Sequence, residues 1–172
     1  MPFSPNSTMG YAQRQWFLNE LSQFSNYGMV VWVNTKPWMG AAEPGIDRWP
    51  GFAAEREYIS NKIVEMGVNN LVSLAGDAHL IGIDSGAHMD YSTSGGAGCV
   101  ALLYSRFYSP PFLWSHIRCG NRFRFPVFHA APMAQYGSSK DIGPFTEGCE
   151  SYRFYMNHQY GTMDVTDDGC TL

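Results

Sequence analysis

Two residues able to bind a metal ion, Asp77 and His79, stand one position apart directly after an apolar run. The run, Leu71–Ala75, ends at Gly76 and has the length and composition of a buried strand. Carboxylate oxygens and imidazole nitrogens are common ligands of metal cations, and ligands of open α/β sheets bind where strands end. The pattern predicts a metal-binding position here. The alternatives are that Asp77 caps a turn and that His79 is a structural, half-buried histidine.

The elements that must position these residues form a strand–helix–strand unit. The run Met29–Val33 is apolar on both faces, which predicts an interior strand. Residues 53–66 carry apolar side chains at helical spacing, and Gly67 follows as a C-terminal cap. With Leu71–Ala75 as the second strand, this order predicts a βαβ unit with two parallel strands.

Parallel strands end at the same edge of a sheet, so distant polar residues can meet there. Asn34 directly follows the first strand, and Asp47 lies in the loop after it. We therefore expect Asn34 and Asp47 to join Asp77 and His79 as metal ligands. Asp47 could instead cap the loop before Trp49, and an asparagine is also an ordinary residue at a strand exit.

Arg56 is a candidate for substrate binding, because a guanidinium can hold a phosphate oxygen. Its position on the predicted helix, one turn before the buried face, favours a structural ion pair with Glu55 or Asp47 instead.

The flanking segments have weaker patterns. Residues 1–8 are rich in Pro, Ser and Asn and predict a loose arm, and residues 13–24 predict a helix. Residues 122–128 alternate and contain a proline, which suggests an edge strand, and residues 158–166 predict a final strand.

Composition limits the function classes. The chain has 172 residues, enough for one domain or a large part of one, and a net charge of -4, which argues against non-specific nucleic-acid binding. We expect no membrane span and no signal peptide, because no apolar run is long enough and the N-terminus has no basic segment before an apolar one. Disulfides and buried thiols both remain open for the four cysteines, Cys99, Cys119, Cys149 and Cys170.

The order of several short motifs resembles the PhoD-like alkaline phosphatases, a branch of the metallophosphoesterases. The motifs are Gly10–Trp16, Val33–Trp38, Asp47–Phe52 with Glu55-Arg56, Gly76–His79, and a tail of Ala131-Pro132, Gly137–Lys140 and Gln159–Gly161.

The resemblance implies an α/β sandwich with mixed sheets that hydrolyses phosphomonoesters or phosphodiesters at a multinuclear metal centre. It implies Asp77 and His79 as catalytic metal ligands, Asp47 and Asn34 as further ligands, and Arg56 as a substrate contact. The metal ions it implies are divalent or trivalent, with Fe, Ca, Zn and Mn as candidates. Members of this family are often secreted or found in the endomembrane system, and the sequence leaves the compartment open.

The chain departs from the family in one respect, because the metal-ligand segments of the family's N-terminal half have no counterpart in residues 1–172. We therefore expect a single partial domain that lacks its N-terminal half and is a poor catalyst alone. One face of Leu71–Ala75 should then be exposed and could associate with the missing half. The alternative is a binding or regulatory half-domain that keeps the fold without the activity.

Overall fold

The computed structural model describes residues 7–77, 82–84, 86, 89–95, 104–106, 114–116, 127–129 and 162–164. The elements are α1 (Gly10–Leu21), η1 (Phe24–Asn26), β1 (Val30–Asn34), η2 (Trp49–Phe52), α2 (Ala53–Met66), β2 (Leu71–Ala75), β3 (Gly82–Asp84), β4 (Tyr104–Arg106), β5 (Trp114–His116), β6 (Val127–His129) and β7 (Thr162–Asp164). His79, the four cysteines and the tail motifs lie outside the described residues.

The larger sheet has the strand order β1-β2-β6-β3, and the smaller one has the order β5-β4-β7. β1 and β2 are parallel, with Val30 opposite Leu71 and Asn34 opposite Ala75. β6 runs parallel to β2 and antiparallel to β3, so the larger sheet is mixed. The prediction of two parallel strands joined by a helix over 53–66 is confirmed, and the fold class is α/β.

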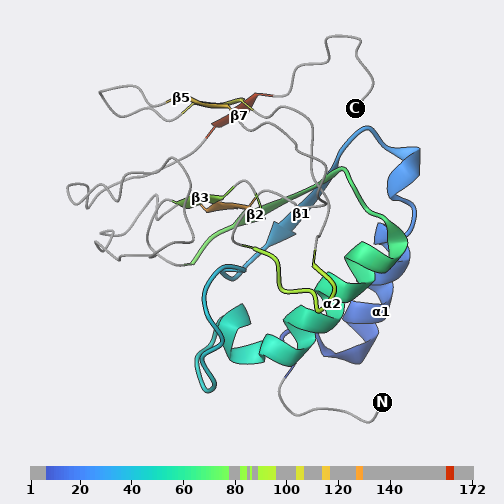
Figure 1. Cartoon of the computed structure of the whole chain (residues 1–172), viewed down its shortest axis with the longest axis vertical. Helices are drawn as coiled ribbons and strands as arrows, with labels where there is room; N and C mark the ends of the chain where they lie inside the picture. The colour runs from blue at the N-terminus through green and yellow to red at the C-terminus, as the bar shows by residue number, and fades with distance from the viewer. Residues whose placement is uncertain are drawn as a thin grey trace, which may run out of the picture.

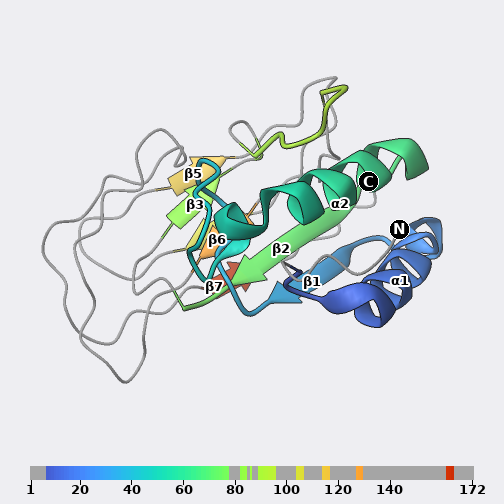
Figure 2. The same cartoon turned by 90° about the horizontal axis from the view of Figure 1, so that it is seen from below.

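Helices α1 and α2 lie along β1 and β2, as Figures 1 and 2 show from two directions. The core between them contains Phe17 of α1, Trp32 of β1 and Ile59 of α2. Trp32 also meets the fully buried rings of Trp38 and Trp49, with centroids 4.9 and 5.9 Å away. These two tryptophans come from the loop after β1, so the core itself holds that loop against the helices.

The prediction that β1 is interior is wrong, because β1 is at the end of the strand order. Val31 and Val33 point away from the helices and are 38% and 74% exposed. The expected exposure of Leu71–Ala75 is also wrong: β2 lies between β1 and β6, and its residues 71–73 are fully buried. The exposed apolar surface therefore lies one strand further out than predicted.

The predicted loose arm is wrong for its last two residues. The hydroxyl of Ser7 and the backbone N–H of Thr8 each donate to the buried carboxylate of Glu55, both at 2.6 Å. The Ser7 Oγ also accepts from the N–H of Gly10 at 2.8 Å, which satisfies a donor of the first turn of α1. α1 consequently begins at Gly10, three residues earlier than the apolar pattern indicates.

Two further boundaries follow from backbone chemistry. Gly67 ends α2 in the left-handed conformation, at φ 70°, as predicted. β6 lies inside the sheet, so the expectation of an edge strand at 122–128 is wrong. The described strand is Val127–His129, which does not include Pro126. Among the described helices, none is long and apolar enough to cross a membrane.

Candidate functional site

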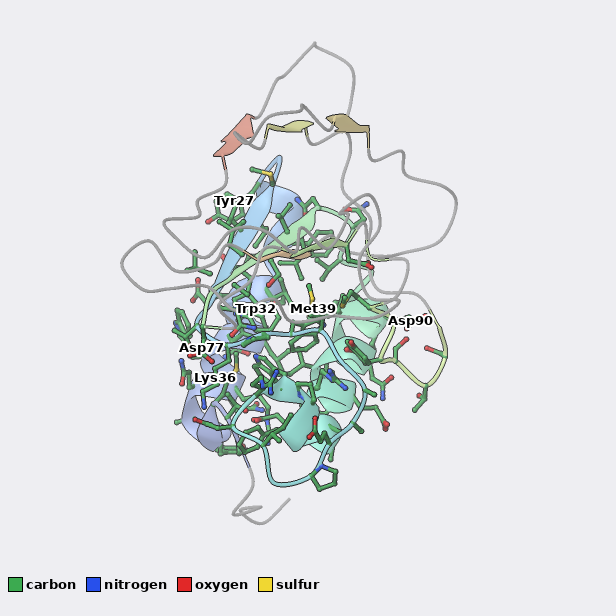
Figure 3. All side chains as sticks on the ribbon, turned by 90° about the vertical axis from the view of Figure 1, so that its left-hand side faces the viewer. Tyr27, Trp32, Lys36, Met39, Asp77 and Asp90 are labelled. Carbon is green, nitrogen blue, oxygen red and sulfur yellow. The ribbon has the colours of Figure 1, made fainter. Side chains whose placement is uncertain are left out.

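The carboxyl ends of β1 and β2 meet at one edge of the larger sheet. Asn34 and Ala75 are the last residues in register, and Lys36 and Asp77 each follow two positions later. Figure 3 labels Lys36 and Asp77 on the same side of the molecule. The sheet register thus brings one cation and one carboxylate to the same edge from segments 41 residues apart in the sequence (77 − 36 = 41).

Asp77 is exposed and has φ 75°, in the left-handed region that few residues other than glycine adopt. This conformation costs roughly 1–2 kcal/mol for a residue with a Cβ atom. The preceding Gly76 does not share it, and a Cβ at Gly76 would meet no atom within 4 Å. The unfavourable backbone conformation therefore belongs to the residue that carries the carboxylate. Residues held in such conformations cluster at functional sites.

Asn34 is buried at 7% exposure and holds the loop that follows β1. Its Oδ1 accepts from the indole N–H of Trp49 at 3.1 Å and from the backbone N–H of Lys36 at 3.3 Å. Its Nδ2 is buried without a hydrogen-bond partner. The oxygen that a metal ion would need is thus directed at two donors of the protein.

Lys36 connects this network to Asp47. The Lys36 ammonium donates to Asp47 Oδ1 and lies 5.9 Å from the centroid of the Phe52 ring. The Asp47 side chain is 86% exposed, whereas that of Lys36 is 28% exposed. Asn34, Lys36 and Asp47 therefore form one connected set at the edge, with the cation partly shielded and the carboxylate open to solvent.

Arg56 is 2% exposed, and its expected partner is wrong. It pairs with neither Glu55 nor Asp47: its Nη1 donates to the carbonyls of Trp38 and Gly40 at 2.8 and 2.9 Å. Helix α2 uses this side chain to hold the loop between β1 and η2. The carboxylate of Glu55 is already engaged with Ser7, Thr8 and Arg14.

The Arg56 guanidinium also stacks on the ring of Tyr91, 3.5 Å from its centroid. Burial lowers the pKa of Arg56, partly offset by Tyr91. Burial raises the pKa of Tyr91, and the nearby Arg56 opposes that shift. The Tyr91 hydroxyl accepts from the Gly40 N–H at 3.1 Å, so both side chains fix the same turn of the loop.

The described residues supply metal donors of a suitable kind but in small number. Asp47 and Asp77 both present carboxylate oxygens, the donors that hard cations prefer. Within the described ranges, no group of three or more His, Cys, Asp or Glu residues is placed to hold a metal ion. The sequence analysis did not select Lys36. It follows the end of the same strand as Asn34, so the argument that polar residues gather at strand ends applies to it as well.

Comparisons with known proteins cover the same segment. A family model described as "PhoD-like phosphatase" matches residues 3–99, more than half of the chain and the whole of the edge around Lys36 and Asp77. The match ends before the tail motifs at 131–161.

"Alkaline phosphatase D" of Bacillus subtilis (strain 168) is 33% identical over 95 residues, which make up 51% of this chain and 16% of that protein. A solved structure titled "Structure of PhoD" is 18% identical, with a TM-score of 0.45 over 76% of this chain and 22% of that chain. The chain thus spans about a sixth of the length of the relative from Bacillus subtilis.

Proposed function

This chain belongs to the PhoD-like phosphatase family, and on that premise we propose that it forms part of a metal-dependent phosphoric ester hydrolase acting on phosphomonoesters or phosphodiesters. The observation that supports the proposal most directly is Asp77, an exposed carboxylate in a left-handed conformation at a sheet edge inside the matched segment. Residues with a Cβ atom in this conformation cluster at functional sites.

The proposed ligand set is Asp77 and His79, with Asp47 as a further ligand; Asn34, whose Oδ1 accepts from two protein donors, is assigned to holding the loop instead. A bound metal ion supplies positive charge to offset the phosphate and lowers the pKa of a coordinated water. The chain's own contribution is to hold Asp77 at the strand end and to anchor the loop that carries Asp47. Asn34 anchors that loop through Trp49, and Arg56 anchors it through two carbonyls.

The finer architecture is also a proposal. We infer that residues 1–172 are one partial domain of a metallophosphoesterase sandwich, because the chain spans only 16% of its relative from Bacillus subtilis. Val31 and Val33, exposed on the free edge strand, offer an apolar surface for the remainder of such a domain. Replacing Val33 with Thr should weaken any such association and leave the monomer folded.

A second candidate function is a binding half-domain without catalytic activity. The observation that favours it is the small number of metal donors within the described ranges. Metal binding separates the two candidates, because only the hydrolase needs it.

The test is titration of the purified chain with Mn²⁺, Ca²⁺, Zn²⁺ and Fe²⁺ by calorimetry, followed by nitrophenol release from mono- and bis-nitrophenyl phosphate. We expect metal binding that is weakened in Asp77→Asn and unchanged in the control Glu57→Gln, whose side chain is exposed on α2. Equal binding by both variants, or none by the wild type, would support the non-catalytic alternative.

Turnover by the chain alone should be low because the donors are few. Fast metal-dependent turnover that is lost in His79→Ala would show a complete active site and refute the argument from donor number.

A further inference from the structure

We propose that Lys36 binds a phosphate oxygen of the substrate and that Asp47 is the counter-ion of Lys36 until phosphate takes its place. The inference rests on the proposed function, because it assigns the part of the site that recognises the phosphate group. It also gives Asp47 a role that the sequence pattern did not suggest: counter-ion of a lysine.

The first support is the placement of Lys36. Its backbone N–H donates to the Asn34 side chain, so its Cα is fixed relative to the end of β1. The register ends with Asn34 opposite Ala75, so Lys36 and Asp77 both follow strand ends at the same edge of the sheet. A lysine at this edge is suited to contact a phosphate bound there.

The second support is the environment of the ammonium group. The Lys36 side chain is 28% exposed and lies over the Phe52 ring, which partly shields it from water. Partial shielding strengthens a charge interaction relative to the same interaction in bulk water. The Lys36 side chain nevertheless keeps 28% of its surface exposed, as an incoming phosphate requires.

The third support is that the present partner is easily exchanged. Asp47 is 86% exposed, and ion pairs of this kind contribute little to stability. A phosphate oxygen offers the ammonium a charge-assisted hydrogen bond and carries at least as much negative charge. The substrate can therefore replace Asp47 as the partner of Lys36 without unfolding any element.

Arg56, the cation that the sequence pattern suggested for substrate binding, is directed elsewhere. It is 2% exposed and donates to two backbone carbonyls of the loop, which would lose their partner if the side chain turned outward. Lys36 therefore takes the phosphate-binding role that the sequence pattern suggested for Arg56, and Arg56 holds the loop in place.

The two roles of Asp47 predict opposite effects of Asp47→Asn. If Asp47 only competes with phosphate for Lys36, removing its charge raises phosphate affinity. If Asp47 serves the phosphate only through a bound metal, the same substitution lowers that affinity. The double variant Lys36→Met/Asp47→Asn shows no gain if the effect passes through Lys36.

The experiment is calorimetric titration of the full chain with inorganic phosphate at low ionic strength, without added metal. Lys36→Met should weaken binding by about tenfold or more, since a hydrogen bond to a charged group contributes about 1.5–3 kcal/mol and 1.4 kcal/mol is tenfold. Lys36→Arg should retain binding, because it keeps the charge and the donor. The control is Lys62→Met, which removes the exposed pair of Lys62 with Glu65 on α2 and should change nothing.

Three results would overturn the inference: no phosphate binding by the wild type, equal binding by Lys36→Met, or equal weakening by Lys62→Met. Weaker binding by Asp47→Asn would overturn the role given to Asp47. Each of these outcomes leaves the proposed function standing if metal binding still depends on Asp77. If the chain binds no metal but still binds phosphate through Lys36, the phosphate-binding role of Lys36 stands and the proposed hydrolase activity is rejected.

Discussion

Asp77→Gly should make the protein more stable and at the same time remove a candidate metal ligand. Asp77 has φ 75°, which glycine adopts without a steric penalty. One backbone angle links the two effects. The same residue supplies the carboxylate and has a φ angle that its Cβ atom disfavours.

The expected gain is the difference of two terms. Relief of the left-handed conformation contributes roughly 1–2 kcal/mol, and the larger conformational entropy of glycine in the unfolded chain costs about 0.4–1 kcal/mol. The net stabilisation is therefore about 0–1.6 kcal/mol. For a chain of this size, 1 kcal/mol changes Tm by about 2–4 °C, so Tm should rise by up to roughly 6 °C.

The assay is thermal and urea unfolding of the wild type, Asp77→Gly and the matched control Asp47→Gly. Asp47 is not at positive φ and loses its ion pair with Lys36, so its glycine variant should be destabilised by about 0.4–2 kcal/mol. Asp77→Asn should behave like the wild type in stability, because asparagine also tolerates the left-handed region. Destabilisation of Asp77→Gly to the level of the control would refute the argument from backbone strain.

Three further predictions concern the loop and its anchors. Arg56→Met should lower the free energy of unfolding by about 1–3 kcal/mol in urea denaturation, because it removes the Arg56 donor from the buried carbonyl of Trp38 and the part-buried carbonyl of Gly40; an unchanged free energy of unfolding would contradict this. Gly51→Ala should destabilise by about 1–3 kcal/mol, since its Cβ would collide with the carbonyl oxygen of Ile46, whereas Gly76→Ala meets open space and should be tolerated in the same assay. Burial raises the pKa of Tyr91, so the neutral phenol contributes fully to stability below pH ~10, and this contribution is lost as pH rises through the raised pKa. Tyr91→Phe should therefore reduce the loss of stability with rising pH in the alkaline range. The same slope in the variant and the wild type would contradict this prediction.

The residue pattern predicts α2 and β2 at their observed bounds and β1 to within one residue. Apolar runs of strand length and helical spacing fixed β2 and α2 at their observed bounds, because these patterns follow from side-chain periodicity alone. Gly67 as the helix cap follows from the same local chemistry. The parallel pairing of β1 with β2 also followed from chain order, since a helical connection between neighbouring strands favours it.

Which polar groups meet depends on long-range packing. Arg56 binds backbone carbonyls, whose positions depend on how the loop folds over the helix, and no residue type in the sequence marks them. Glu55 anchors the N-terminal arm from 48 residues away in the sequence, a pairing that no periodicity records. The exposure of β1 likewise depends on its place in the strand order. An apolar run can have the same residue pattern at the edge of a sheet as in its centre. Local pattern sets the elements, whereas long-range packing sets the partners of each side chain.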